Sequence, residues 1–229
     1  MRASEHAYAA LLEEIQVGIL PPGAVLGEVE QAARFGVSRT PLREAIGRLV
    51  ADGLAVQQSP RVTVVAAMDA DDIRQLFTVR RSLEETAARL AAARREAARA
   101  FDALARAFAA VTLGDADARD DYYSLIAAFD AELDRAAAND YLSAALRTLR
   151  THLVRVRRLA RDNPERLTRS VQEHHLIAAA IADGNAELAA HATHIHLHNA
   201  LEFTLAALPD TVAPDSEPRP PSRRPKGTA

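Results

Sequence analysis

The chain has 229 residues, 48% of them hydrophobic and only 4% aromatic, and its apolar residues are mainly Ala and Leu. Ala and Leu lose little conformational freedom in a helix, so this composition predicts a folded, mostly α protein. The formal net charge of −3 gives no support by itself for nucleic-acid binding, and the absence of cysteine excludes disulfides and thiolate metal sites.

The N-terminal segment predicts three helices in close succession. The first is expected from Ser4 to about Gly18, the second from Glu28 to about Arg34, and the third from Ser38 to about Asp52. Ser38 is a favoured N-cap, and Pro41 lies in the first turn, where its missing N–H costs nothing. The second and third helices, joined by a tight turn, have the helix-turn-helix pattern.

Two short β-like runs follow, Leu54–Gln58 and Arg61–Val65, with Ser59-Pro60 between them. They predict a small hairpin, or wing, after the third helix. We therefore expect residues 1–66 to form a winged helix-turn-helix domain with a small β wing.

The rest of the chain predicts an all-α six-helix bundle over residues 69–208. Asp69 is expected to cap its first helix, with Asp72 three residues later. The expected helices run to about Ala92, then over Arg94–Thr112, Arg119–Ala138, Asp140–Ala160, Glu165–Asp183 and Ala186–Leu208. Residues 209–229 are rich in proline and charge and are expected to be disordered.

The start of the third helix carries side chains suited to DNA. Arg39 and Arg43 lie one turn apart on one face, with Thr40 between them, and arginine is the residue best suited to grip guanine through two hydrogen bonds. By spacing alone, an ordinary exposed basic helix remains an equal alternative.

The N-terminal segment closely resembles the winged helix of GntR-family regulators. The resemblance is carried by Gly18–Gly23, Gly36–Ala45 and Asp52–Leu54. It implies that operator DNA is contacted by four residues of the third helix and one of the wing: Ser38, Arg39, Thr40, Arg43 and Arg61. The chain departs from the family at Gly27, Val29 and the wing tip Ser59-Pro60.

The bundle resembles the FCD effector domain of the FadR subfamily, in its shorter, VanR-like form with six helices. The residues that carry this resemblance include Val79-Arg80, Leu83-Glu84, Glu173-His174 and His196-Leu197. Many such domains bind a divalent metal through an Asp and three His. The corresponding positions here are Ile126, Asp130, His174 and His196, so one ligand is lost and another is changed.

Helical periodicity at about 100° per residue places Asp130, His174 and His196 each on the apolar face of its helix. The resemblance then implies a site for Zn, Ni or Mn, while each residue singly is also explained as a satisfied core residue. Arg80 lies on the apolar face of the first bundle helix, where an inward guanidinium suits a small carboxylate effector. An i, i+4 pair with Glu84 is the equal alternative.

These features lead to one functional hypothesis. We expect a cytoplasmic, homodimeric transcriptional repressor without membrane partners, which binds double-stranded operator DNA and is controlled by a small organic acid. Activation in place of repression stays open. The alternatives are a regulator in which the metal itself is the signal and a metal-dependent enzyme, although no nucleophile constellation or phosphate loop is visible for the latter.

Overall fold

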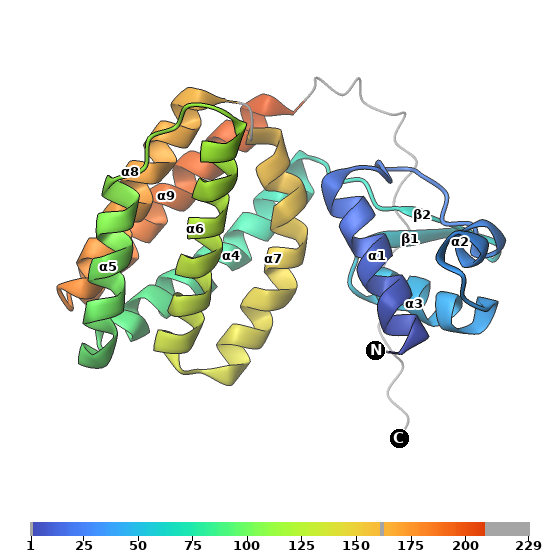
Figure 1. Cartoon of the computed structure of the whole chain (residues 1–229), viewed down its shortest axis with the longest axis horizontal. Helices are drawn as coiled ribbons and strands as arrows, with labels where there is room; N and C mark the ends of the chain where they lie inside the picture. The colour runs from blue at the N-terminus through green and yellow to red at the C-terminus, as the bar shows by residue number, and fades with distance from the viewer. Residues whose placement is uncertain (1, 161–162, 209–229) are drawn as a thin grey trace.

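The N-terminal head packs three helices against a two-stranded sheet in the computed structural model, which describes residues 2–160 and 163–208 (Figure 1). The helices are α1 (Ala3–Val17), α2 (Glu28–Phe35) and α3 (Arg39–Ala51). Strands β1 (Ala55–Ser59) and β2 (Val62–Val65) pair antiparallel, as the predicted hairpin requires. The core of the head is formed by fully buried side chains that recur at helical spacing, such as Leu11, Leu42 and Leu49.

Two glycines end the first two helices of the head. Gly18 ends α1 at a φ of 80° and Gly36 ends α2 at a φ of 63°, both in the left-handed region that favours glycine. Ser38 occupies the N-cap position of α3 with an extended backbone, but its side chain makes no capping hydrogen bond. The expected cap is therefore wrong in its chemistry although right in its position, and the Ser38 hydroxyl does not hold the helix start.

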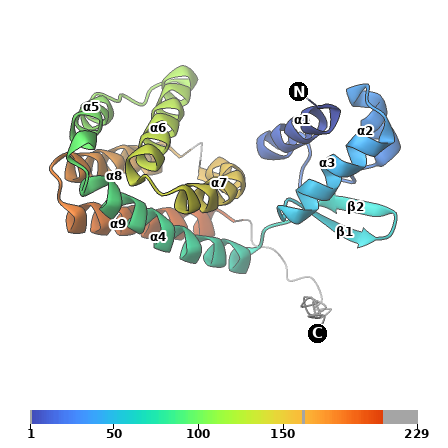
Figure 2. The same cartoon turned by 90° about the horizontal axis from the view of Figure 1, so that it is seen from below.

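Six α-helices form the bundle in the described part of the chain, as expected: α4 (Ala70–Ala92), α5 (Ala98–Ala109), α6 (Ala116–Ala137), α7 (Asp140–Ala160), α8 (Pro164–Ala182) and α9 (Ala186–Ala207). Figures 1 and 2 show α4 and α9 side by side along one side of the bundle. Asp69 caps α4 by accepting from the Asp72 N–H at 2.8 Å, while the Asp72 carboxylate accepts from the Asp69 N–H. This confirms the predicted capping box.

Two details of the bundle differ from expectation. The helix expected from Arg94 begins as a short 3-10 helix, η1 (Arg95–Ala97), because the backbone of Arg94 is extended. The helix expected from Arg119 starts earlier, because Asp115 caps it by accepting from the Ala118 N–H. The bounds expected for the two domains stay a prediction, and the tail expected at residues 209–229 lies outside the described residues.

The head contacts the bundle at helix α7. The Gln16 side chain donates to the Thr151 carbonyl at 3.2 Å, and the Arg155 guanidinium donates to the Ala66 carbonyl. Over residues 2–160 and 163–208, none of the helices combines the length and the apolar character needed to span a bilayer.

Candidate functional site

The first candidate site is the exposed start of α3. Ser38, Arg39, Thr40 and Arg43 are all exposed, while Leu42 between them is fully buried in the head. The helix is therefore fixed by its apolar face, and its polar face projects from the molecule. This is the arrangement in which a recognition helix places its N-terminal residues against base edges.

A carboxylate from another helix binds both arginines. Glu28, the first residue of α2, accepts from Arg43 Nε at 2.9 Å, from Arg43 Nη2 at 2.8 Å and from Arg39 Nη2 at 3.3 Å. The hydrogen bonds from Arg43 lower the pKa of Glu28 to about 2, although partial burial opposes them. Sequence reasoning missed Glu28, since it lies 15 residues from Arg43 and only packing brings them together.

The wing contributes Arg61, which is exposed in the turn between β1 and β2. Its backbone N–H lies 3.4 Å from the Ser59 hydroxyl. The register of the hairpin shifts between Gln57 and Ser59, so the turn is irregular where the family resemblance departs from its pattern. Arg61 is thus accessible, and its role in DNA contact stays a prediction.

The second candidate site is a cavity of about 70 Å³ inside the bundle. This is about half the volume of an engineered cavity of ~150 Å³ that binds benzene, so it suits a small ligand. Apolar side chains of α4, α6 and α7 form one part of its wall, among them Phe77, Ile126 and Leu153. The polar part is formed by Arg80, Tyr122, Arg166, Ser170, His174 and His196.

Each arginine of the cavity is held by a buried carboxylate. Arg80 Nε donates to Glu84 at 2.7 Å, and their side chains are 6% and 11% exposed. This is the i, i+4 pair that the sequence offered as the alternative for Arg80. Arg166 Nη1 donates to Glu173 at 3.1 Å, with 7% and 12% exposure. Arg166 was not anticipated; its only sequence signal is its position in the first turn of a helix that carries His174.

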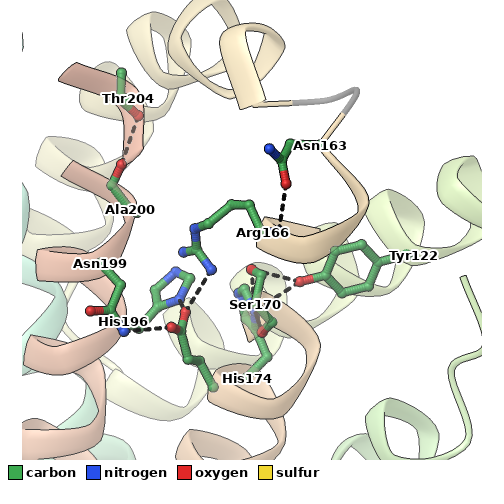
Figure 3. A network of polar contacts seen from close by, with 10 residues as sticks. Tyr122, Asn163, Arg166, Ser170, His174, His196, Asn199, Ala200 and Thr204 are labelled. Atoms are coloured by element: carbon green, nitrogen blue, oxygen red, sulfur yellow. Dashed lines mark hydrogen bonds and ion pairs between the residues drawn. The ribbon is translucent and has the colours of Figure 1, made fainter. Parts of the chain in front are cut away.

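The two histidines are oriented by acceptors on α8 (Figure 3). His174 Nδ1 lies 2.7 Å from the Ser170 carbonyl, and His196 Nδ1 lies 2.7 Å from Glu173. Since a carbonyl and a carboxylate only accept, Nδ1 carries the proton in both rings. The ring centroids are 4.4 Å apart, so the expected convergence of His174 and His196 is observed.

Glu173 and Ser170 each connect several groups of this network. Glu173 also accepts from Asn199 Nδ2 at 2.7 Å, so one carboxylate holds Arg166, His196 and Asn199 in place. The Tyr122 hydroxyl donates to the Ser170 hydroxyl at 2.8 Å, and burial raises the pKa of Tyr122 well above its usual value. The polar wall is therefore rigid and largely satisfied.

The residues of the cavity do not fit a divalent metal. Asp130 pairs with Arg150 at 3.6 Å, and Ile126, at another ligand position of the family, is apolar. Among the described residues no group of three or more His, Cys, Asp or Glu is placed to hold a metal ion. The structure thus does not support the expected trio of Asp130, His174 and His196, because periodicity gave the face of Asp130 but not its neighbour.

Helix α7 presents different residues to the cavity and to the head. Leu153 and Val156 line the cavity. His152 faces the head, where a side chain at Gly53 would meet its ring at 3.6 Å. Burial lowers the pKa of His152, and a hydrogen bond with the Asp52 backbone opposes this shift. One helix therefore contacts both the cavity and the head.

Comparison with known proteins gives two family matches. The model of the bacterial regulatory proteins of the gntR family matches residues 3–65, and the FCD domain model matches residues 75–199. A "Probable D-xylose utilization operon transcriptional repressor" of Paenarthrobacter nicotinovorans is 30% identical over 192 residues, which cover 82% of each chain.

Two further relatives match different shares of the chain. An HTH-type transcriptional regulator from the TAR-I ttuE-ttuC' intergenic region of Agrobacterium vitis is 37% identical over 36% of this chain. The chain spans about half, 48%, of that relative's length. The solved structure of McbR/YncC of E. coli superposes with a TM-score of 0.70 at 19% identity, over 90% of this chain and 98% of that one. At this identity the likeness shows the fold alone.

Proposed function

Because the chain belongs to the GntR family of bacterial regulatory proteins and carries an FCD domain, we propose that it is a transcriptional repressor that binds operator DNA through its head and is controlled by a small carboxylate in its bundle. The carrying observation is the exposed start of α3, where Arg39 and Arg43 project from a helix fixed by buried Leu42. Bidentate arginines at a helix start are suited to guanine in the major groove.

DNA binding is tested with the full chain and the duplex that it enriches from a library of random sequences. Arg39→Ala and Arg43→Ala are each expected to abolish operator binding in a mobility-shift assay without unfolding the protein. The matched control is Arg106→Ala, which removes an equally exposed arginine from the bundle, where it pairs with Asp102. Wild-type affinity in both head variants would refute the proposal.

The effector proposal is supported by the two arginines of the cavity. Arg80 uses its Nε and Nη2 on Glu84, and Arg166 uses Nη1 on Glu173, so each guanidinium retains further N–H groups. A carboxylate that enters the cavity can accept from these groups, and the His174 and His196 rings offer partners for a hydroxyl of the same ligand. A small monocarboxylate, with or without a hydroxyl, fits this wall and volume.

The effect on DNA is proposed to pass through α7. A ligand beside Leu153 and Val156 presses on one face of this helix, and the opposite contacts, from Thr151 to Gln16 and from Arg155 to Ala66, hold the head. A ligand shifts the operator affinity only by its differential affinity for the DNA-bound and released arrangements. The network around Glu173 links α8 and α9, so a ligand that displaces its side chains also displaces these helices. The ligand therefore has different affinities for the two arrangements.

We propose further that the protein acts as a homodimer. Exposed apolar side chains recur on the outer faces of the neighbouring helices α4 and α9: Val79, Leu90, Leu188 and Ile195. A two-fold symmetric pair of heads supplies the contact area that a single helix-turn-helix lacks. Light scattering on the full chain is expected to give a dimer, and Ile195→Glu is expected to give a monomer with weakened operator binding.

A further inference from the structure

Arg43 is held by only one of its two hydrogen-bonding edges. The guanidinium plane has one fork formed by Nε and Nη2 and a second formed by Nη1 and Nη2. Glu28 occupies the first fork, with Nε to Oε1 at 2.9 Å and Nη2 to Oε2 at 2.8 Å. The second fork faces away from the carboxylate and retains the geometry that grips two acceptors of a guanine edge.

Glu28 also changes the charge that DNA meets. Arg39 and Arg43 together carry two positive charges, and the carboxylate between them reduces the local sum to one. A phosphate competes directly with a carboxylate for a guanidinium, because both are anions that accept two parallel hydrogen bonds. A guanine edge is neutral and takes the second fork without displacing Glu28. The cluster therefore disfavours backbone contacts more than base contacts.

The position of Glu28 is fixed independently of the arginines. It is the first residue of α2, after Gly27 at the N-cap, and the positive end of the helix dipole stabilises a carboxylate there. α2 packs on α3, and its residues Gln31 and Ala32 are buried. Glu28 thus fixes the orientation of the Arg43 side chain. This side chain is 66% exposed, and the contacts of the described residues give it no other hydrogen-bond partner.

We infer that Glu28 is a positioning residue that makes the head selective for base edges over phosphates by holding Arg43 and neutralising one of its two neighbouring charges. This inference rests on the proposed function. It assigns specificity to an acidic residue that itself need not touch DNA, and it predicts that loss of the carboxylate strengthens binding to the wrong sequences.

The test compares Glu28→Gln with Glu30→Gln. Both substitutions remove one negative charge from α2, and Glu30 is exposed. Dissociation constants of the full chain are measured over a salt series, for the duplex that wild type enriches from a random library and for a shuffled duplex of equal length. Thermal unfolding by circular dichroism checks that each variant is folded.

Glu28→Gln is expected to lower the ratio of the affinity for the enriched duplex to the affinity for the shuffled duplex about tenfold. The main cause is tighter binding to the shuffled duplex. The salt dependence on that duplex is expected to steepen by about one unit of log K per log salt, because one more phosphate is engaged. Glu30→Gln is expected to change the ratio by less than about twofold, as for a screened surface charge. In an Arg43→Ala background, where operator binding is lost, Glu28→Gln is expected to leave the affinity for the shuffled duplex nearly unchanged.

Three results overturn the inference: Glu28→Gln behaves like Glu30→Gln, both affinities fall by the same factor in a folded variant, or the full effect persists without Arg43. A wild-type chain with equal affinity for both duplexes overturns the proposed function, and this inference with it. A selective wild type with an equally selective Glu28→Gln variant removes the inference alone, so the two failures are distinguishable.

Discussion

Arginine–glutamate pairs occur in both parts of the molecule, at very different depths. In the head, the side chains of Arg39, Arg43 and Glu28 are 63%, 66% and 32% exposed. In the bundle, Arg80 and Glu84 are only 6% and 11% exposed, and the pair of Arg166 and Glu173 is similarly buried. The chemistry of the contacts is the same, and the surroundings differ.

This difference separates two uses of one interaction. In water the attraction between a guanidinium and a carboxylate is screened, and the exposed pair leaves the second hydrogen-bonding edge of Arg43 open to DNA. In the interior, the pair cannot be parted without leaving an uncompensated buried charge. The arginines of the head are therefore accessible to DNA. The arginines of the cavity keep a fixed position and would bind a ligand while they stay paired with their carboxylates.

The largest expected effect is on stability. Glu84→Ala leaves the Arg80 guanidinium buried without its carboxylate, and the free energy of unfolding is expected to fall by about 3–5 kcal/mol. Glu28→Ala breaks an exposed contact and is expected to cost far less. Urea unfolding of both variants measures this contrast. The double variant Arg80→Met/Glu84→Leu is expected to regain most of the lost stability; equal losses in the two single variants would end the comparison.

The next effect concerns the ligand. Acetate, propionate and lactate, added against sodium chloride at equal ionic strength, are expected to raise the thermal midpoint of the full chain by a few degrees, and acetamide is not. Arg166→Gln is expected to remove this increase while the affinity for operator without ligand changes little. Arg106→Gln, which alters an exposed pair, serves as the control. An unchanged carboxylate response in Arg166→Gln would show that the buried arginine does not bind the ligand.

Whether a contact could be predicted from the sequence depends on how far apart its residues lie along the chain. The local pairs were accessible: Arg39 and Arg43 share a face by spacing, and Arg80 with Glu84 is an i, i+4 pair. The contact of Arg43 with Glu28 joins two helices, and that of His196 with Glu173 spans 23 residues. Periodicity places a side chain on a face of its helix but does not name the helix that packs against it.

Asp130 illustrates that limit most clearly. Its position on the apolar stripe of α6 correctly indicated a side chain turned inward, with 16% exposure. In the structure Asp130 points toward Arg150 of α7, which also pairs with Asp134. The cavity is reached from the same helix by Tyr122 and Ile126 instead. The fold class and the recognition helix were therefore predictable, while the polar wall of the cavity required the packing of four helices, α4, α6, α8 and α9.

A smaller effect is expected at the contact between the two parts. Gln16→Ala removes one side-chain hydrogen bond, to the Thr151 carbonyl, which is worth about 1 kcal/mol. The factor by which a carboxylate weakens operator binding is expected to fall, by up to about fivefold, while operator affinity without ligand stays near wild type. Operator titrations with and without ligand measure this factor. Gln75→Ala, an exposed change on α4, is the control, and equal behaviour of both variants would exclude this route.

The smallest expected effect is on the acid titration of Glu28, in the exposed pair of the head. Because hydrogen bonds from Arg43 lower the pKa of Glu28 to about 2, the folded state binds this proton less readily than the unfolded state does. The stability that Glu28 contributes is therefore fully present above its ordinary pKa of 4.5 and is lost as the pH falls toward 2. Carbon-13 NMR of the Glu28 carboxyl, followed from neutral pH to the onset of acid unfolding, measures its lowered pKa directly.

Arg43→Ala is expected to return the pKa of Glu28 toward its ordinary range, because the hydrogen bonds that lower it most are removed and only the weaker contact to Arg39 remains. High salt is expected to narrow the difference between variant and wild type, since an exposed pair is screened within about 10 Å at 0.1 M. A Glu28 carboxyl that titrates alike in both proteins would mean that Arg43 is not held in solution. The head would then present two independent arginines, and its selectivity would need another source.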